Sequence, residues 1–396
     1  MDYRFSERMG GMSGSATREI FKLLSRPEII SFAGGFPATQ CLPIADVAQI
    51  IAEILSGDMG APALQYGSTE GFNHFREELK RYVAGAGVIA ETLDEIQVVS
   101  GGQQGIDLAC KALLDKGDTV LVEDPTYLTA LQIFASYQAN IVGVKAGENG
   151  LDIEDLTVKI IKYKPKILYV VPTFSNPTGN TYSIENRKAI AEITYKNNVV
   201  VLEDDPYAKL RFEGEPLPAL KTFDSGGNIL YVTSFSKVLS PGLRVGAAVG
   251  TKELIRKLAI CKQGVDVTTA NISQLVVANY LKKGLLQPNI DKSLPIYRER
   301  KNAMIAAINA YMPCEYKHTD PHGGLFIWGS IKGLDMATLM PKAIERNVAY
   351  IHGSVFHADG GGKDTFRLNF SNASLERIEI GIKALGGMFK EELAKK

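Results

Sequence analysis

Between residues 96 and 249, short apolar runs alternate with longer amphipathic stretches, and this alternation restricts the fold of the chain more than any other feature. The runs are rich in Val, Ile and Leu, without the polar alternation of half-buried strands, which is typical of strands covered by helices on both faces. Seven runs are predicted strands: Ile96–Val99, Thr119–Val122, Ile141–Val144, Ile167–Val171, Val199–Leu202, Ile229–Thr233 and Arg244–Val249. Predicted helices lie between them: Gln103–Leu114, Leu128–Tyr137, Ile153–Lys162 and Ser183–Asn197. Such an order indicates an α/β fold with a doubly wound, mostly parallel sheet, in which the short spacing at the end suits one antiparallel strand.

The pattern changes after Gly250. Three long helical stretches come first, at Lys252–Lys262, Asn271–Lys283 and Leu294–Tyr311. Short strands near Gly324–Trp328, Val348–Ile351 and Thr365–Phe370 and a last helix at Leu375–Ala394 follow. We therefore expect three parts: an N-terminal arm and short helix (1–45) packed on the small domain, a large domain (46–290) and a smaller α+β domain (291–396).

Composition narrows the classes of partner. The chain has 44 basic and 44 acidic side chains, a balance that argues against nucleic-acid binding. The four cysteines are far apart and form no CxxC pair, which favours reduced thiols. Signal-peptide and membrane-spanning patterns are missing, so we expect a cytoplasmic protein that binds no membrane. Pro321 separates His318 from His322, and no metal site is predicted.

Ligands of open α/β sheets bind beyond the carboxyl ends of the strands, and five predicted strands end in unusual polar residues. The first such segment, Ser100–Gly105, reads SGGQQG and opens a helix. Its small residues and the helix N-terminus suit a phosphate group. With Glu123 at the end of the next strand, it also resembles a dinucleotide fingerprint. A plain tight turn is the alternative.

Two further strand ends carry an aromatic ring and an amide. Tyr127, in Asp124-Pro-Thr-Tyr127, is placed to stack on a planar ligand or to pack in the core. Asn176, in Ser175-Asn-Pro-Thr-Gly179, lies on a loop and either hydrogen-bonds a ligand or forms a simple Asx turn.

The last two strand ends carry charges. Three acids, Glu203, Asp204 and Asp205, follow a strongly apolar strand. Burial there favours a cationic partner such as Mg²⁺ or a protonated ring nitrogen, and a solvated turn is the alternative. Lys237 follows another apolar strand within Ser234-Phe-Ser-Lys237, with Arg244 seven residues on. Lysine forms Schiff bases when burial or a neighbouring cation lowers its pKa, and serine hydroxyls with an arginine suit a phosphate dianion.

Together these segments resemble the class I/II aminotransferases, which have the fold type I architecture and depend on pyridoxal phosphate. The resemblance runs from about Arg18 to the C-terminus and is carried by Ser175–Gly179, Asp204–Tyr207, Ser234–Lys237 with Arg244, and Phe366-Arg367-Leu368. Thr17–Ile20 and Phe32–Pro37 look most like the 2-aminoadipate and kynurenine aminotransferase group. The resemblance implies a seven-stranded large domain, a smaller α+β domain and a homodimer with shared active sites.

The resemblance also implies roles for single residues. Lys237 would bind the cofactor as a Schiff base and move a proton at the substrate Cα. Asp204 would pair with the pyridine nitrogen, although Asp205 is one residue away. Tyr207 and Asn176 would hydrogen-bond the phenolic oxygen of the cofactor. Lys237, Asp204 and Tyr207 are thus the predicted catalytic residues, and Tyr127 would stack on the ring.

The remaining roles concern the phosphate and the substrate. The phosphate would be surrounded by Gly102, Gln103, Ser234, Ser236 and Arg244, with Tyr66 reaching it from the other subunit. Arg367 would bind the substrate α-carboxylate, Gly35 would contact it through its backbone, and Asn176 would lie beside it. Arg18 would meet an ω-carboxylate or swing away to admit aromatic or branched side chains.

The predicted activity is transfer of an amino group from an L-amino acid (2-aminoadipate, an aromatic or a branched-chain donor) to a 2-oxo acid such as 2-oxoglutarate. Three alternatives stay open. One is the sensor domain of a winged-helix transcription regulator, for which we expect no room before Arg18. Another is a nicotinamide-dependent dehydrogenase, which leaves Lys237, Arg244 and Arg367 unexplained. The third is a different reaction on the same fold, such as a lyase or decarboxylase reaction.

Overall fold

A computed structural model describes residues 1, 3–10 and 26–396 of the chain. Its larger sheet has the order β2-β9-β8-β7-β6-β3-β4-β5. The strands are β2 (Ile96–Val99), β3 (Thr119–Asp124), β4 (Asn140–Gly147), β5 (Gly150–Leu151), β6 (Ile167–Val170), β7 (Val200–Asp205), β8 (Ile229–Ser234) and β9 (Gly246–Val249). Strands β8, β7, β6, β3 and β4 run parallel to one another, whereas β9 is antiparallel to both β2 and β8. The seven predicted strands are confirmed, and β5, too short to leave a pattern in the sequence, adds an eighth.

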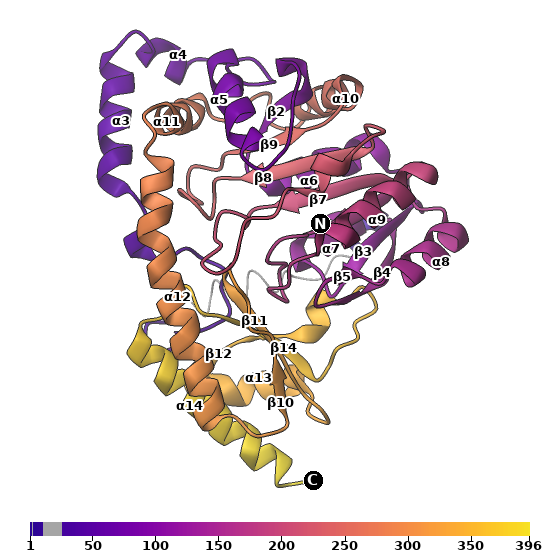
Figure 1. Ribbon diagram of the computed structural model, residues 1–396, viewed down its shortest axis with the longest axis vertical. Helices are drawn as coiled ribbons and strands as arrows, with labels where there is room; N and C mark the ends of the chain where they lie inside the picture. Colours follow the sequence, from indigo (N-terminus) through magenta and orange to yellow (C-terminus); the bar gives the residue numbers. More distant parts are fainter. Residues whose placement is uncertain (2, 11–25) are drawn as a thin grey trace.

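Helices cover both faces of this sheet, as the unbroken apolar runs predict (Figure 1). Leu121, Leu168 and Val201 pack in one buried cluster with α8 and α9. Val120 and Leu202 belong to the main core, on the side of α6 and α7. The helices are α6 (Gly102–Leu113), α7 (Leu128–Ser136), α8 (Ile153–Tyr163) and α9 (Ile184–Lys196). Each strand thus buries alternate side chains on opposite faces.

Further helices complete the large domain above its antiparallel edge (Figure 1). They are α3 (Ile44–Ser56), α4 (Gly60–Leu64), α5 (Asn73–Ala84), α10 (Lys252–Gln263) and α11 (Asn271–Lys282), with single 3₁₀ turns η2 (Leu93–Glu95) and η3 (Leu220–Phe223). Helix α10 packs on α6 and β2, and α11 packs on α3 and α5. Helices α10 and α11, which follow the change of sequence pattern at Gly250, therefore still belong to the large domain.

Helix α12 (Leu286–Tyr311) runs from the large domain to the small one (Figure 1). It begins eight residues before the predicted Leu294, and Pro295, a residue type that usually ends or kinks a helix, lies inside it. The expected boundary between residues 290 and 291 falls in its first turns.

The small domain contains a four-stranded sheet, β10-β11-β14-β13, and the helices α12 and α14, which pack on each other. Its elements are β10 (Tyr316–His318), β11 (Phe326–Ile331), α13 (Met336–Glu345), β12 (Val348–Ala349), β13 (Ile351–His352), η4 (Gly353–Phe356), β14 (Thr365–Asn369) and α14 (Leu375–Leu393). All pairs in this sheet are antiparallel.

The N-terminal arm divides between the domains. Strand β1 (Ile30–Ser31) pairs in parallel with β12, and the turn η1 (Thr39–Cys41) lies against α12. Helix α1 (Glu7–Gly10) instead contacts α7, and Glu7 pairs with Lys116 at 2.6 Å. Only the later part of the described arm therefore lies on the small domain.

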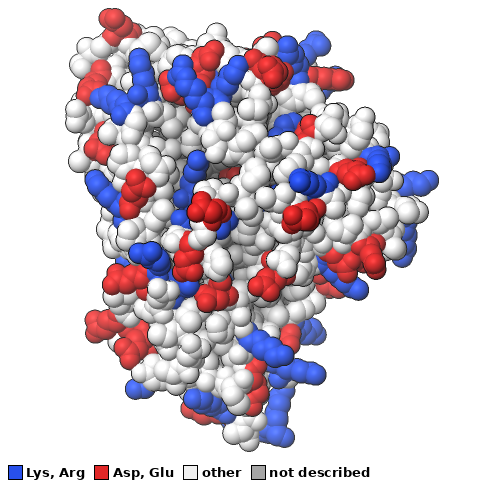
Figure 2. All heavy atoms as spheres, viewed as in Figure 1, with Lys and Arg blue, Asp and Glu red and all other residues white. Residues whose placement is uncertain are grey.

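Charges of both signs are interspersed over the face seen in Figure 2, in keeping with a net charge of zero. Among the described residues, no helix combines the length and the apolar character needed to cross a membrane.

Candidate active site

A cavity of about 640 Å³ opens at the carboxyl ends of the parallel strands, between the two domains and the N-terminal arm. Nearly every residue that the sequence analysis predicts for the site lines this one cavity: Gly35, Gly102, Gln103, Tyr127, Asn176, Asp204, Tyr207, Ser234, Ser236, Lys237, Arg244 and Arg367. The structure therefore brings together segments that are up to 332 positions apart in the chain, from Gly35 to Arg367.

Lys237 follows β8 and directs its amine into the cavity. Its Nζ donates a hydrogen bond to the carbonyl oxygen of Gly35 in the arm, at 2.9 Å. Burial, helped by the positive charges of Arg244 and Arg367, lowers the pKa of Lys237 to about 8, and Asp204 opposes this shift. About a tenth of the amine is therefore neutral at pH 7, far more than for an exposed lysine, and able to act as a nucleophile or base.

The three acids at the end of β7 have different partners. Glu203 accepts the backbone N–H groups of Leu220 and Lys221, each at 2.7 Å, and so fixes a turn. Asp205 accepts a hydrogen bond from the Tyr231 hydroxyl at 2.8 Å and does not line the cavity. Of the three acids, only Asp204 lines the cavity. The geometry therefore favours Asp204 over Asp205 as the acid that meets a ligand.

Asp204 is buried, and its Oδ2 accepts the hydroxyl of Tyr169 at 2.9 Å. Burial raises the pKa of Asp204 to about 7; the Tyr169 hydrogen bond lowers it and the charge of Asp205 raises it. A buried carboxylate of this kind gains most from a cationic partner brought in by a ligand.

The N-terminus of α6 forms another part of the wall. Gly101 has φ +84°, a conformation that favours glycine, and a Cβ there would lie 2.5 Å from Nη2 of Arg244. That Nη2 donates to the Ser100 carbonyl at 3.1 Å. Arg244 itself has φ 53° and precedes β9, which begins two residues later than the predicted strand. With Ser234 and Ser236 nearby in the lining, this corner offers hydroxyl, guanidinium and helix N-terminal donors to one anion.

Arg367 forms the opposite wall, on β14 of the small domain. It is buried, and donates to Oδ1 of Asn176 at 2.6 Å and to the Ala33 carbonyl at 2.5 Å. Its Cζ lies 4.2 Å from the ring centre of Phe326 and 5.0 Å from that of Phe356. Burial lowers the pKa of Arg367 to about 10, so the guanidinium still carries its charge at neutral pH.

Successive side chains of β14 point to opposite faces of its sheet, as in any strand. Phe366 stacks on Tyr316 in the core, at 5.3 Å between ring centres, while Arg367 faces the cavity. Asn176 links the two domains here, because it contacts both Arg367 and the Tyr207 hydroxyl.

Two residues with evident contacts in the site were missed. Tyr169 lies within a predicted strand and donates its hydroxyl hydrogen bond to Asp204. The only sign of this role in the sequence is a tyrosine in an otherwise aliphatic run. Phe326 packs its face on Arg367 and meets Tyr207 edge-on at 5.9 Å between ring centres. Nothing in an apolar strand residue distinguishes such a contact from ordinary core packing.

The comparison of Ser100–Gly105 with a dinucleotide fingerprint is wrong. Strand β2 and strand β3 are not neighbours, since β9, β8, β7 and β6 separate them. Glu123 is buried and accepts hydrogen bonds from Val171 N, from Ser175 Oγ at 3.0 Å and from the Tyr182 hydroxyl at 2.6 Å. It therefore holds the Ser175–Gly179 loop and faces no ribose.

Residues 28–385 match the family described as aminotransferase class I and II. The chain belongs to this family. It is 38% identical to aromatic-amino-acid aminotransferase 1 of Thermococcus litoralis, covering 100% of this chain and 96% of that protein.

Solved structures agree with this assignment. A kynurenine aminotransferase of Pyrococcus horikoshii, in complex with PMP, superposes with a TM-score of 0.94 at 37% identity, over 98% of this chain and 97% of that one. The α-aminoadipate aminotransferase LysN of Thermus thermophilus, complexed with N-(5'-phosphopyridoxyl)-L-leucine, gives 0.92 at 36% identity, over 99% and 98%. The fold is that of the fold type I aminotransferases.

The cavity of this family member fits a pyridoxal phosphate group. The anion-binding corner has room at Gly102, where a Cβ would lie 3.5 Å from Oδ1 of Asp204 and 3.7 Å from Cβ of Ser234. The Nε of Arg367 is buried without a hydrogen-bond partner among the described residues. An amine, a buried acid and an anion-binding corner thus surround one space of suitable size.

Tyr66 is not among the described residues that line this cavity. Tyr66 follows α4 and is 82% exposed, on the surface of the chain. Arg18 lies outside the described residues, and its role stays a prediction.

Outside the cavity, Asp124 and Asp359 lie beside His357, whose Nδ1 is 2.9 Å from Oδ1 of Asp124. The absence of a metal site stays a prediction.

Proposed function

We propose that the chain is an aminotransferase that moves an amino group from an L-amino acid to a 2-oxo acid such as 2-oxoglutarate, with pyridoxal phosphate as cofactor. The carrying observation is the single cavity in which Lys237 and Asp204 face Arg367 across the domain interface. Membership of the aminotransferase family supports the same conclusion. When bound, the cofactor supplies an electron sink for the negative charge that develops at the substrate Cα.

Lys237 is the proposed anchor of the cofactor and the base that moves the proton at the substrate Cα. A pKa of about 8 leaves it able to take and return a proton near neutral pH. Its hydrogen bond to the Gly35 carbonyl holds the free amine of the apoprotein at the cavity wall.

Asp204 is proposed to face the pyridine nitrogen and keep it protonated, and Tyr169 fixes the carboxylate for that task. Tyr207 and Asn176 are proposed to donate to the phenolic oxygen, and Tyr127 to stack on the ring. The phosphate is assigned to the corner formed by Gly102, Gln103, Ser234, Ser236 and Arg244.

Arg367 is proposed to bind the substrate α-carboxylate, which every amino-acid donor carries. The faces of Phe326 and Phe356 exclude water from the guanidinium, and this strengthens its attraction for an anion. Gly35 adds a backbone contact. Arg18 is proposed to read the substrate side chain, whether acidic, aromatic or branched.

We further propose a homodimer with shared active sites, in which the exposed Tyr66 reaches the phosphate of the partner subunit. The cytoplasmic location also stays a prediction.

A panel of amino donors tested with 2-oxoglutarate checks the function. We expect glutamate to form from at least one of 2-aminoadipate, aromatic and branched-chain donors, and a visible absorption band from the cofactor. A band without turnover would favour a sensor domain; turnover without glutamate would favour a lyase or decarboxylase. Either result would contradict the aminotransferase proposal.

A further inference from the structure

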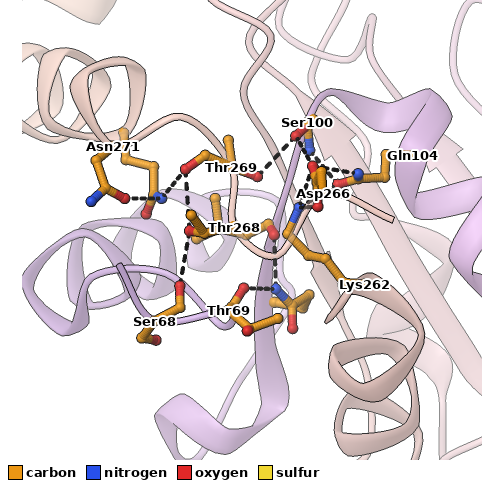
Figure 3. A network of polar contacts seen from close by, with 12 residues as sticks. Ser68, Thr69, Ser100, Gln104, Lys262, Asp266, Thr268, Thr269 and Asn271 are labelled. Atoms are coloured by element: carbon orange, nitrogen blue, oxygen red, sulfur yellow. Dashed lines mark hydrogen bonds and ion pairs between the residues drawn. The ribbon is translucent and has the colours of Figure 1, made fainter. Parts of the chain in front are cut away.

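A partly buried polar network of Ser100, Gln104, Lys262 and Asp266 lies beside the loop that opens α6 (Figure 3). None of these four residues lines the cavity. The network joins the loop before α6 to the segment between α10 and α11. Lys262, near the end of α10, is the most deeply buried member, with its side chain 0% exposed. This lysine has no part in the proposed mechanism.

Lys262 has two polar partners. Its Nζ lies 2.7 Å from Oδ1 and 2.9 Å from Oδ2 of Asp266, and 2.7 Å from Oε1 of Gln104. Burial would raise the pKa of Asp266, but hydrogen bonds from Lys262, Gln104 and Ser100 outweigh it and hold that pKa below its usual value. The network therefore contains a carboxylate ion, held by donors from three segments of the chain.

Ser100 is held through its backbone N–H, its hydroxyl and its carbonyl. Its backbone N–H donates to Oε1 of Gln104 at 2.8 Å, and its hydroxyl donates to Oδ2 of Asp266 at 2.8 Å. Its carbonyl accepts from Arg244 at 3.1 Å. Gly101 and Gly102 follow directly, so the direction of the N–H groups that open α6 depends on how Ser100 is held.

The segment after Asp266 is held just as tightly. Val267 has φ 64°, which is uncommon for a β-branched residue and persists only where neighbouring contacts enforce it. Thr268 donates to the Ser68 carbonyl at 3.0 Å (Figure 3). Asn271, at the start of α11, donates to the Gln65 carbonyl at 2.8 Å. One linker thus contacts both the loop before α6 and the segment that carries Tyr66.

Such a network is a costly way to gain stability alone. An apolar group of similar volume often stabilises a buried site as well as an ion pair does. Here the network is directed toward the loop that opens α6, because Asp266 and Gln104 both accept hydrogen bonds from Ser100.

We propose that Lys262, Asp266 and Gln104 are positioning residues that hold the Ser100–Gly102 backbone in the shape that binds the cofactor phosphate. The inference rests on the proposed function, because it assigns the phosphate to this corner. None of the three residues touches the reacting atoms. Their effect is expected on affinity for the phosphate group, separately from affinity for the pyridine ring.

Titration of the apoprotein with pyridoxal phosphate and with pyridoxal, which lacks the phosphate, tests this. Loss of a charged hydrogen-bonding partner in Asp266→Asn should weaken binding of pyridoxal phosphate about tenfold or more. Binding of pyridoxal should stay within about twofold, because the ring contacts are elsewhere. Ser100→Ala removes only one hydroxyl, should keep the fold, and should give a loss of about threefold for pyridoxal phosphate alone.

Asp224→Asn is the matched control. Asp224 forms a buried ion pair with Lys221 at 2.6 Å, with side chains 2% and 12% exposed, and lines no part of the cavity. This change should lower the melting temperature without altering the ratio of the two affinities. If Asp266→Asn does not fold, Ser100→Ala decides.

An unchanged ratio of affinities in Ser100→Ala and in folded Asp266→Asn would overturn the inference, because an equal loss for both ligands means a structural role. A wild-type protein that binds neither ligand would instead contradict the proposed function.

Discussion

The two sides of the cavity hold their charges in different ways. On the large-domain side, Lys237 and Asp204 carry opposite charges, and burial moves both pKa values toward neutrality, to about 8 and about 7. On the small-domain side, Arg367 keeps its charge and is surrounded by a carbonyl, an amide and two aromatic faces.

The difference separates two tasks. A group whose pKa lies near the working pH can give and take protons, whereas a permanently charged guanidinium can only hold an anion. The large-domain side is suited to chemistry and the small-domain side to placing the substrate. Changes on the first side should therefore appear in kcat, and changes on the second in kcat/KM.

The largest effect is expected from Asp204→Asn. Loss of a buried charge that faces the developing charge of the transition state should lower kcat roughly a hundred- to thousandfold, with a smaller change in KM. Steady-state kinetics with one good donor measures this. Asp205→Asn is the control, because its carboxylate faces Tyr231; a severe Asp205→Asn with a mild Asp204→Asn would reverse the assignment.

Arg367→Ala should lower kcat/KM about ten- to hundredfold, the usual cost of losing one buried charged hydrogen-bonding partner. The loss should be similar for acidic, aromatic and branched donors, because all carry the α-carboxylate. A donor panel checks it. A loss confined to acidic donors would mean that Arg367 reads the side chain instead.

Changes at Asp204 and at Arg367, on the two sides of the cavity, should shift the pH profile of cofactor attachment in opposite directions. Attachment needs the neutral amine of Lys237, so its rate should rise with pH and level off above about 8. Asp204 raises that pKa and Arg367 lowers it. Asp204→Asn should therefore shift the profile of the apoprotein to lower pH, and Arg367→Met to higher pH. Shifts of the same sign would show that these two charges do not control Lys237.

The smallest effect is expected from Tyr66→Phe. If the partner subunit's hydroxyl contributes one hydrogen bond to the phosphate, its loss should weaken cofactor affinity only about two- to tenfold. Equilibrium dialysis of the cofactor and light scattering check this together. A fully active monomer would contradict the shared site.

The large-domain side could be predicted from the sequence because strands in parallel sheets end at a common edge. Lys237 and Asp204 each follow an apolar run, so their meeting follows from the topology alone. Strand alternation placed Arg367 on the opposite face from Phe366, but the cavity that it enters became evident only in the structure.

Other features depend on packing that leaves no local signal. Lys262 and Asp266 have the i,i+4 spacing of an ordinary exposed pair, yet contact with α6 buries the lysine completely. The same holds for Phe326, whose aromatic face could belong to any core. The predicted ribose-binding role of Glu123 was wrong because β2 and β3, although consecutive in the chain, are not neighbours in the sheet.

The most direct test is to locate the covalent attachment of the cofactor. Borohydride reduction of the holoenzyme, followed by peptide mapping, should place the pyridoxyl label on Lys237, in the peptide that contains Ser234-Phe-Ser-Lys237. Lys237→Ala should abolish the label and the turnover while retaining cofactor held by the other cavity contacts. A label on any other lysine, or full activity without Lys237, would contradict the assignment of this residue.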